Sequence, residues 1–89
     1  MNINRKERIN LQSQKITIIG IGESGKGAAL LSNQLGANVF ISDKNVNSNN
    51  ISSRDKLIEL GIDVELGTHS DRIYDSELWI ISPGIAQSS

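Results

Sequence analysis

The stretch KITIIGIGESG, residues 15–25, decides the fold of this 89-residue chain. A β-type run leads directly into three glycines spaced as GxGxxG, and a helical pattern follows over residues 24–35. A second β-type run, residues 38–42, ends in Asp43, which lies eighteen positions after Gly25. Strand, glycines, helix, strand and acid in this order are typical of a nucleotide-binding βαβ unit.

The glycines predict a site for a phosphate group. Gly20 lets the chain turn sharply as it leaves the strand, and Gly22 has no side chain that would keep a phosphate from the backbone. Gly25 and Gly27 are expected to let the start of the helix pack closely against the sheet. The first helical N–H groups lack intrahelical partners, so they favour an anion. Asp43 is placed to accept a hydrogen bond from a ribose hydroxyl or a base; the alternative is a tight turn that binds no ligand.

Composition points to one small soluble domain with an aliphatic core. Only 37% of the residues are hydrophobic, and three are aromatic. Nine basic and ten acidic residues give a net charge of −1, which argues against nucleic acid or an anionic membrane as the main partner. The absence of cysteine excludes disulfides and thiolate chemistry. Neither a secretory signal nor an apolar run of the ~20 residues that span a bilayer is present, so we expect a cytoplasmic protein.

The apolar pattern predicts an α/β, Rossmann-like three-layer domain over residues 15–89, preceded by a polar tail, residues 1–14. Residues 62–66 alternate between apolar and polar, as in a half-exposed edge strand, which favours a parallel sheet of about four strands in order 3-2-1-4. Three other runs are nearly continuous and indicate strands covered on both faces, at residues 16–19, 39–41 and 78–81.

Two glycines, Gly36 and Gly61, are expected to close the two helices in a left-handed conformation. The second helix is predicted to begin near Ser52, where Ser52 and Asp55 offer a capping box after a polar loop, residues 44–50. Leu57, Ile58 and Leu60 are expected to face the sheet, and a helical turn is expected over residues 70–75. We expect His69 to lie on the surface and Trp79 to pack in the core or on a sheet face.

After the last strand the chain reads Ser82-Pro83-Gly84-Ile85. Proline ends the strand, and Gly84 exposes backbone at the carboxyl edge of the sheet, where the glycine loop and Asp43 also lie. Ligands of open α/β sheets bind at this edge. Taken alone, these residues are better explained by an ordinary strand-terminating turn than by a role in ligand binding.

Three pieces together resemble the N-terminal domain of the Mur ligases: residues 18–25, the pair Ser42-Asp43, and residues 81–85. Within that family the chain is most similar to the MurD type, which adds D-glutamate to UDP-N-acetylmuramoyl-L-alanine in peptidoglycan synthesis. The likeness covers roughly residues 15–86. Its discriminating piece is the Ser-Pro-Gly-Ile ending, because many dehydrogenases share the glycine loop.

The resemblance implies that this domain holds the UDP part of UDP-N-acetylmuramoyl-L-alanine. Glu23 and Ser24 would offer backbone N–H groups to the diphosphate, and Asp43 would accept from the uracil or its neighbourhood. Glu23 departs from the family pattern, as do the two residues after the acid. The complete predicted site comprises Gly20, Gly22, Glu23, Ser24, Gly25, Asp43, Lys44, Asn45 and Gly84.

The family's chemistry, in which ATP activates a carboxylate as an acyl phosphate, is implied only for a longer protein. The chain contains no GxxxxGK[ST] phosphate loop. We therefore expect ATP and magnesium to bind in other domains, and this chain to be a binding piece of a larger ligase, without catalytic residues, metal ligands or a cofactor of its own.

Two alternatives remain open at this point. An NAD-binding domain of a dehydrogenase or regulatory protein would use Asp43 on the adenosine ribose. A scaffold that has lost its ligand would explain Glu23 in the loop.

With the strand order 3-2-1-4, residues 78–81 would form an apolar edge of the sheet, which the resemblance to the Mur ligases implies is covered by a further strand in a longer protein. Self-association along this edge is therefore expected.

Overall fold

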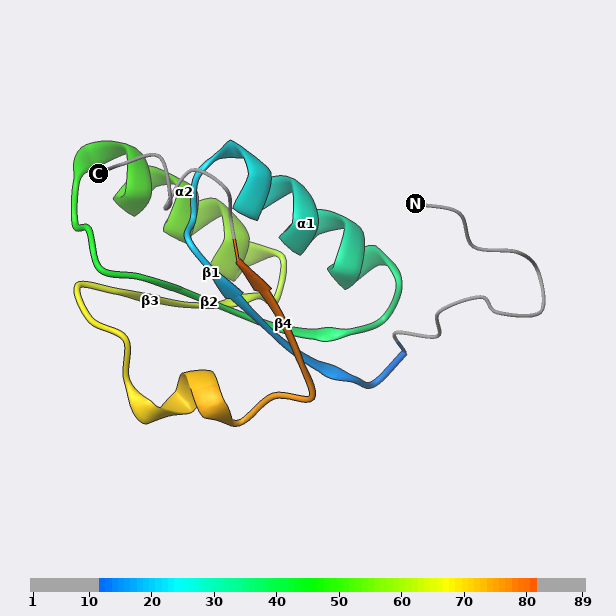
Figure 1. Cartoon of the computed structure of the whole chain (residues 1–89). Coiled ribbons are helices and arrows are strands. Elements are labelled where there is room, and N and C mark those ends of the chain that lie inside the picture. The colour runs from blue at the N-terminus through cyan, green and yellow to red at the C-terminus, as the bar shows by residue number, and fades with distance from the viewer. Residues whose placement is uncertain (1–11, 82–89) are drawn as a thin grey trace.

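A computed structural model describes residues 12–81, which fold into one four-stranded parallel sheet in the order β3-β2-β1-β4 (Figure 1). Gly84 and the Ser-Pro-Gly-Ile ending lie outside the described residues. The predicted α/β, Rossmann-like fold and the 3-2-1-4 order are confirmed. The elements are β1 (Lys15–Ile19), α1 (Glu23–Gln34), β2 (Asn38–Asp43), α2 (Ser48–Glu59), β3 (Asp63–Leu66), the 3-10 helix η2 (Asp71–Tyr74) and β4 (Leu78–Ile81).

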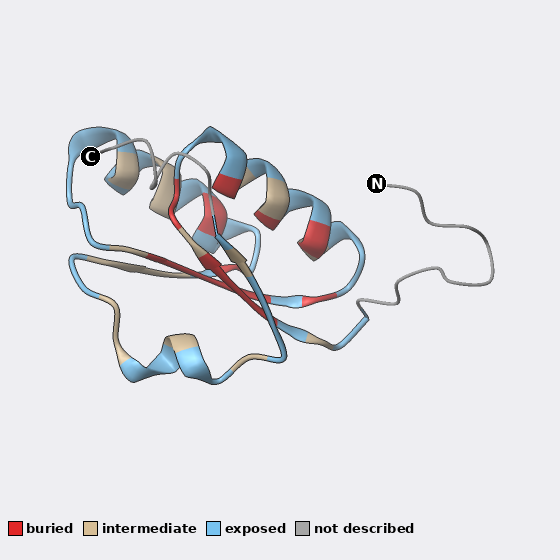
Figure 2. Cartoon of the chain, in the orientation of Figure 1, coloured by how far each residue is buried: buried red, intermediate tan, exposed pale blue. Residues whose placement is uncertain are grey.

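Both α-helices cover the same face of the sheet, and the core lies beneath them (Figures 1 and 2). Ile16 and Ile18 of β1 and Ile41 of β2 are completely buried there. The core is aliphatic, as the composition predicts, and also contains Ile21, Ala29, Ala37, Val39, Leu57 and Ile62. Neither helix in residues 12–81 has the length and hydrophobicity needed to cross a membrane.

The opposite face of the sheet carries η2, which joins β3 to β4 (Figure 1). The guanidinium of Arg72 lies 4.2 Å from the ring centre of Phe40, and the rings of Tyr74 and Trp79 are 5.6 Å apart. Trp79 is 44% exposed and Ile81 63%. Trp79 therefore packs on the sheet face against Tyr74, while β4, expected to be covered on both faces, is covered only in part on this face by residues 12–81.

The two helices end in the same way, as their sequences predict. Gly36 and Gly61 have φ angles of +88° and +87°, which only glycine adopts cheaply. At the end of α1, the amides of Gly36 and Ala37 donate to carbonyls of the last turn, both at 3.1 Å. The equivalent bonds close α2, so each helix returns directly into the next strand.

The predicted start of α2 at Ser52 is wrong, because the helix begins four residues earlier. Asn47 is its N-cap, and the Asn47 side chain accepts a hydrogen bond from the amide of Asn50 at 2.9 Å. Asparagine caps a helix as well as serine does, and here it acts first along the chain. Only Leu57 of the three predicted core residues is buried, since Ile58 and Leu60 are 51% and 53% exposed.

Candidate ligand-binding site at the carboxyl edge of the sheet

The glycine loop connects β1 to α1 at the carboxyl edge of the sheet. Gly20 has a φ of +104°, and a Cβ on Gly25 would lie 1.9 Å from the Gly20 carbonyl oxygen. Both positions therefore require glycine. Gly22 has open space around its Cα, as a phosphate-binding role requires. Gly27 also faces open space, so the prediction that it allows close packing against the sheet is wrong.

The start of α1 leaves backbone amides available to an anion. The first backbone bond at this end joins the Lys26 amide to the Gly22 carbonyl at 2.8 Å. In any α-helix the amides before that bond, here those of Glu23, Ser24 and Gly25, point out of the helix end. The Glu23 side chain is 93% exposed and pairs with Lys26 Nζ at 3.1 Å. Its carboxylate is therefore turned into solvent and neutralised.

Asp43 lies beside the glycine loop and is tied to it. Its Oδ2 accepts a hydrogen bond from the Ile21 amide at 2.9 Å, and its Oδ1 accepts one from the Asn45 amide at 2.8 Å. The Gly20 amide also donates to the Ser42 carbonyl at 2.9 Å. Each carboxylate oxygen has two lone pairs, so Asp43 retains capacity for one further donor on each.

The structure brings the predicted site residues of the glycine loop and Asp43 together, and it places Lys44 and Asn45 next to them on the surface. The Asn45 carbonyl accepts from the Asn50 side chain at 2.9 Å, which fixes the start of the loop into α2. Lys44 forms no ion pair with any of residues 12–81. It is a cation at the edge of the site that no described carboxylate neutralises.

A polar cluster on the η2 side supports the end of β2. Ser42 is completely buried, and its hydroxyl contacts Glu65 of β3 and His69 of the following loop. Partial burial would raise the pKa of Glu65, but hydrogen bonds from the Ser70 hydroxyl and amide and from the Ser42 hydroxyl, together with the charge of Arg72, hold that pKa below its ordinary value. His69 is half-buried in this cluster, so the expectation of a surface histidine is wrong.

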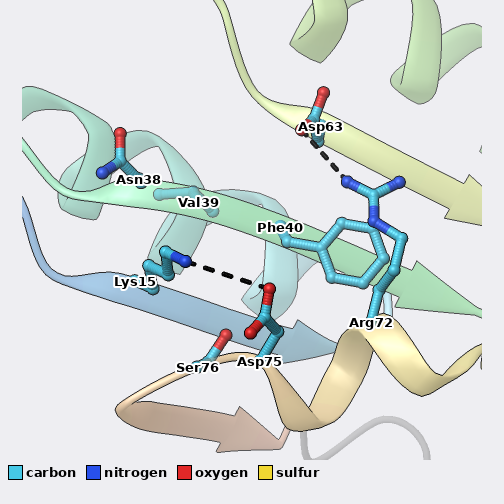
Figure 3. A pocket seen from close by; sticks show the side chains of 8 residues that line it. All are labelled: Lys15, Asn38, Val39, Phe40, Asp63, Arg72, Asp75 and Ser76. Carbon is cyan, nitrogen blue, oxygen red and sulfur yellow. Dashed lines mark hydrogen bonds and ion pairs between the residues drawn. The ribbon is translucent and has the colours of Figure 1, made fainter.

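A cavity of about 220 Å³ lies at the opposite, amino edge of the sheet (Figure 3). Its charged side chains neutralise one another, since Lys15 pairs with Asp75 at 3.9 Å and Arg72 with Asp63 at 3.2 Å. An ionic ligand would have to displace one of these partners. The carboxyl edge, with its open helix end, is therefore the better candidate site.

Comparison with known proteins identifies the family to which this chain belongs. A family model described as the MurD N-terminal domain matches residues 15–89, which is most of the chain. The chain belongs to the MurD N-terminal domain family. The glycine loop, Asp43 and β4 all lie within the matched region.

Curated relatives of this MurD N-terminal domain are named UDP-N-acetylmuramoylalanine–D-glutamate ligase. The protein from Chloroherpeton thalassium is 38% identical over 79 residues, and that from Cytophaga hutchinsonii is 42% identical over 78 residues. These alignments cover 89% and 86% of the chain but only 17% of each relative. The chain thus spans about a sixth of the length of the ligases that it matches.

Proposed function

We propose that this MurD-type domain binds the UDP part of UDP-N-acetylmuramoyl-L-alanine at the carboxyl edge of its sheet. The diphosphate would accept hydrogen bonds from the amides of Glu23 and Ser24, and the Ser24 hydroxyl would add a further donor. Asp43 would accept from the uracil or its neighbourhood through its remaining lone pairs. Lys44 and Asn45 lie beside it, and Gly84 would approach the nucleotide through its backbone.

The observation that carries this proposal is the pairing of an open helix end with a fixed carboxylate. The Ile21 amide donates to Asp43 at 2.9 Å, so the glycine loop and the acid are joined to each other by the fold itself. Gly22 leaves room for the phosphate in the middle of that edge. Preorganised donors cost little to order on binding.

We further propose that the longer protein to which this domain belongs is a cytoplasmic, ATP-dependent ligase of peptidoglycan precursor synthesis. The names of the relatives support that activity. ATP and magnesium would bind in other domains, since this sequence contains no phosphate loop of the GxxxxGK[ST] type. The domain alone would bind substrate without catalysing its reaction.

Calorimetry with the 89-residue chain tests the proposal. We expect UDP, and more strongly UDP-N-acetylmuramoyl-L-alanine, to bind more tightly than NAD. Binding of NAD with no response to either uridine nucleotide would show that the domain is a dinucleotide site instead. No response to any of the three would favour a scaffold that has lost its ligand.

The matched pair Gly22→Val and Gly27→Val locates the phosphate. At both positions an added Cβ would meet nothing within 4 Å. Gly22 has ordinary φ and ψ angles of −61° and −173°, which valine tolerates. We expect Gly22→Val to abolish UDP binding and Gly27→Val to preserve it, because the amides around Gly27 are already bonded within α1. Equal affinities for the two variants would place the diphosphate elsewhere.

A further inference from the structure

The loop between β3 and η2 is fastened to the end of β2 by one buried hydroxyl. Ser42 Oγ lies 2.9 Å from Glu65 Oε2, 3.1 Å from the Thr68 carbonyl oxygen and 2.6 Å from His69 Nδ1. Ser42 is completely buried, so water does not replace these partners. The single proton of this hydroxyl is therefore engaged within the cluster, and its contact with His69 lies within hydrogen-bonding distance as well.

Counting protons determines the state of the histidine ring. A hydroxyl carries one proton, and a carboxylate or a carbonyl oxygen can only accept. Glu65 Oε2 and the Thr68 carbonyl oxygen can only accept, so they share or compete for the single Ser42 proton, which leaves none for His69. The 2.6 Å contact is favourable only if His69 Nδ1 carries a proton and donates it to Ser42 Oγ. The ring is thus held with Nδ1 protonated, and Nε2 is its basic atom.

The same loop also contacts the backbone of Asp43. The Gly67 amide donates to the Asp43 carbonyl at 2.8 Å, two residues before His69. The Ser70 amide donates to Glu65 Oε2 at 2.9 Å and closes the loop on β3. Residues 67–70 therefore hold the end of β2 from one side, and the glycine loop holds it from the other through Ile21 and Gly20.

We propose that His69 is a positioning residue for the site at the carboxyl edge: by donating from Nδ1 to Ser42, it fixes residues 67–70 against β2 and so fixes Asp43 relative to the glycine loop. The contacts of His69 do not depend on the proposed function; only the conclusion that they serve nucleotide binding rests on it. His69 acts through its contact with Ser42 and through the Gly67 amide of the same loop.

Nuclear magnetic resonance tests the proton directly. His69 is the only histidine in the chain, so long-range ¹H–¹⁵N correlations from its ring need no assignment by mutation. At a pH where the ring is neutral, we expect the proton on Nδ1. A neutral ring protonated on Nε2 would overturn the proposal.

Amide hydrogen exchange in the ligand-free chain tests the positioning. His69→Leu removes the donor, and we expect exchange at Gly67 and Ile21 to accelerate about tenfold, the effect of losing one hydrogen bond. His69→Asn offers an amide N–H close to the position of Nδ1 and should restore slow exchange at both. The Ile18 amide, in the middle of β1, is the control for global unfolding and should exchange equally slowly in all variants.

The outcomes separate a positioning role from a merely structural one. Acceleration at Gly67 without any change at Ile21 would confine His69 to its own loop and overturn the proposal. Failure of His69→Asn to restore exchange would overturn it as well. Because no nucleotide is present, loss of the proposed UDP binding would leave this test unaffected.

Discussion

A matched pair of alanine substitutions tests the close approach that shapes the glycine loop. Gly25 and Gly27 lie two residues apart in α1, and both are followed by ordinary helix. A Cβ at Gly25 would lie 1.9 Å from the Gly20 carbonyl oxygen and 3.6 Å from Ile18 Cγ2, whereas a Cβ at Gly27 would meet nothing within 4 Å. The same methyl group is therefore blocked by backbone at one site and accommodated at the other.

The expected free energies of unfolding follow from two terms. Replacing glycine by alanine inside a helix stabilises it by about 1 kcal/mol, and Gly27→Ala gains this in full. Gly25→Ala gains the same term, but α1 must move away from Gly20, or Gly20 from α1, by more than an ångström to relieve the contact. Overpacking of this kind costs about 3 kcal/mol. We therefore expect the two variants to differ by about 3 kcal/mol, with Gly25→Ala the less stable.

Thermal unfolding followed by circular dichroism measures this difference. For a domain of this size 1 kcal/mol shifts Tm by about 4 to 8 °C, so the two variants should melt roughly 12 to 24 °C apart. Gly27→Ala should melt about 4 to 8 °C above the unmodified chain. Tm values for the two variants within a few degrees of each other would refute the close approach between Gly25 and Gly20.

Two further predictions concern the polar cluster on the η2 side of the sheet and the outer edge of β4. Because the pKa of Glu65 is lowered in the folded chain, its contribution to stability is fully present above the unfolded pKa near 4.5 and is lost as the pH falls through the folded pKa. Glu65→Gln should therefore cost about 1 kcal/mol at pH 7, and its disadvantage in urea unfolding should begin to shrink as the pH falls below 4.5 and disappear below the folded pKa. A disadvantage that is the same at pH 7 and pH 3 would contradict this. In residues 12–81 no strand pairs with the outer edge of β4, so light scattering should show self-association that rises with concentration. Ile81→Lys should reduce this association, whereas Ile58→Lys, a control of similar exposure on α2, should not. A strictly monomeric chain, or equal effects of the two lysines, would exclude association through that edge.

Most of the fold follows from local sequence because its signals are physical requirements of the backbone. Gly20 and Gly36 occupy left-handed conformations, and the apolar runs of β1 and β2 form the two interior strands of the described sheet. The alternation over residues 62–66 identifies the edge strand for the same reason. These features depend on near neighbours, so no knowledge of distant contacts is needed to interpret them.

The support of the site could not be predicted in this way, because it consists of contacts between residues far apart in the chain. The hydrogen bond between Ile21 and Asp43 spans 22 positions, and the one between Ser42 and His69 spans 27. The sequence predicts a ligand for Asp43 because this acid ends the strand that follows the glycine loop and its helix, and it predicts a surface position for His69 because this residue lies in a loop after the edge strand. A Ser-Asp pair at the end of a strand and a lone histidine after the next strand are the only signals, and both are weak.

Different contacts on the two faces of the sheet position the residues at its carboxyl edge. On the helix side, aliphatic packing under α1 fixes β1 and β2, and these strands position the glycine loop that follows β1. On the η2 side the contacts are polar, and the Ser42 cluster fixes the β3 loop instead. Asp43 stands where the two meet, because its carboxylate bonds to the glycine loop and its carbonyl to Gly67. A substitution on either side should therefore loosen the Asp43 carboxylate. Gly25→Ala should do so by moving the glycine loop, whose Ile21 amide donates to Asp43, and His69→Leu by weakening the contact between the Gly67 loop and the Asp43 carbonyl.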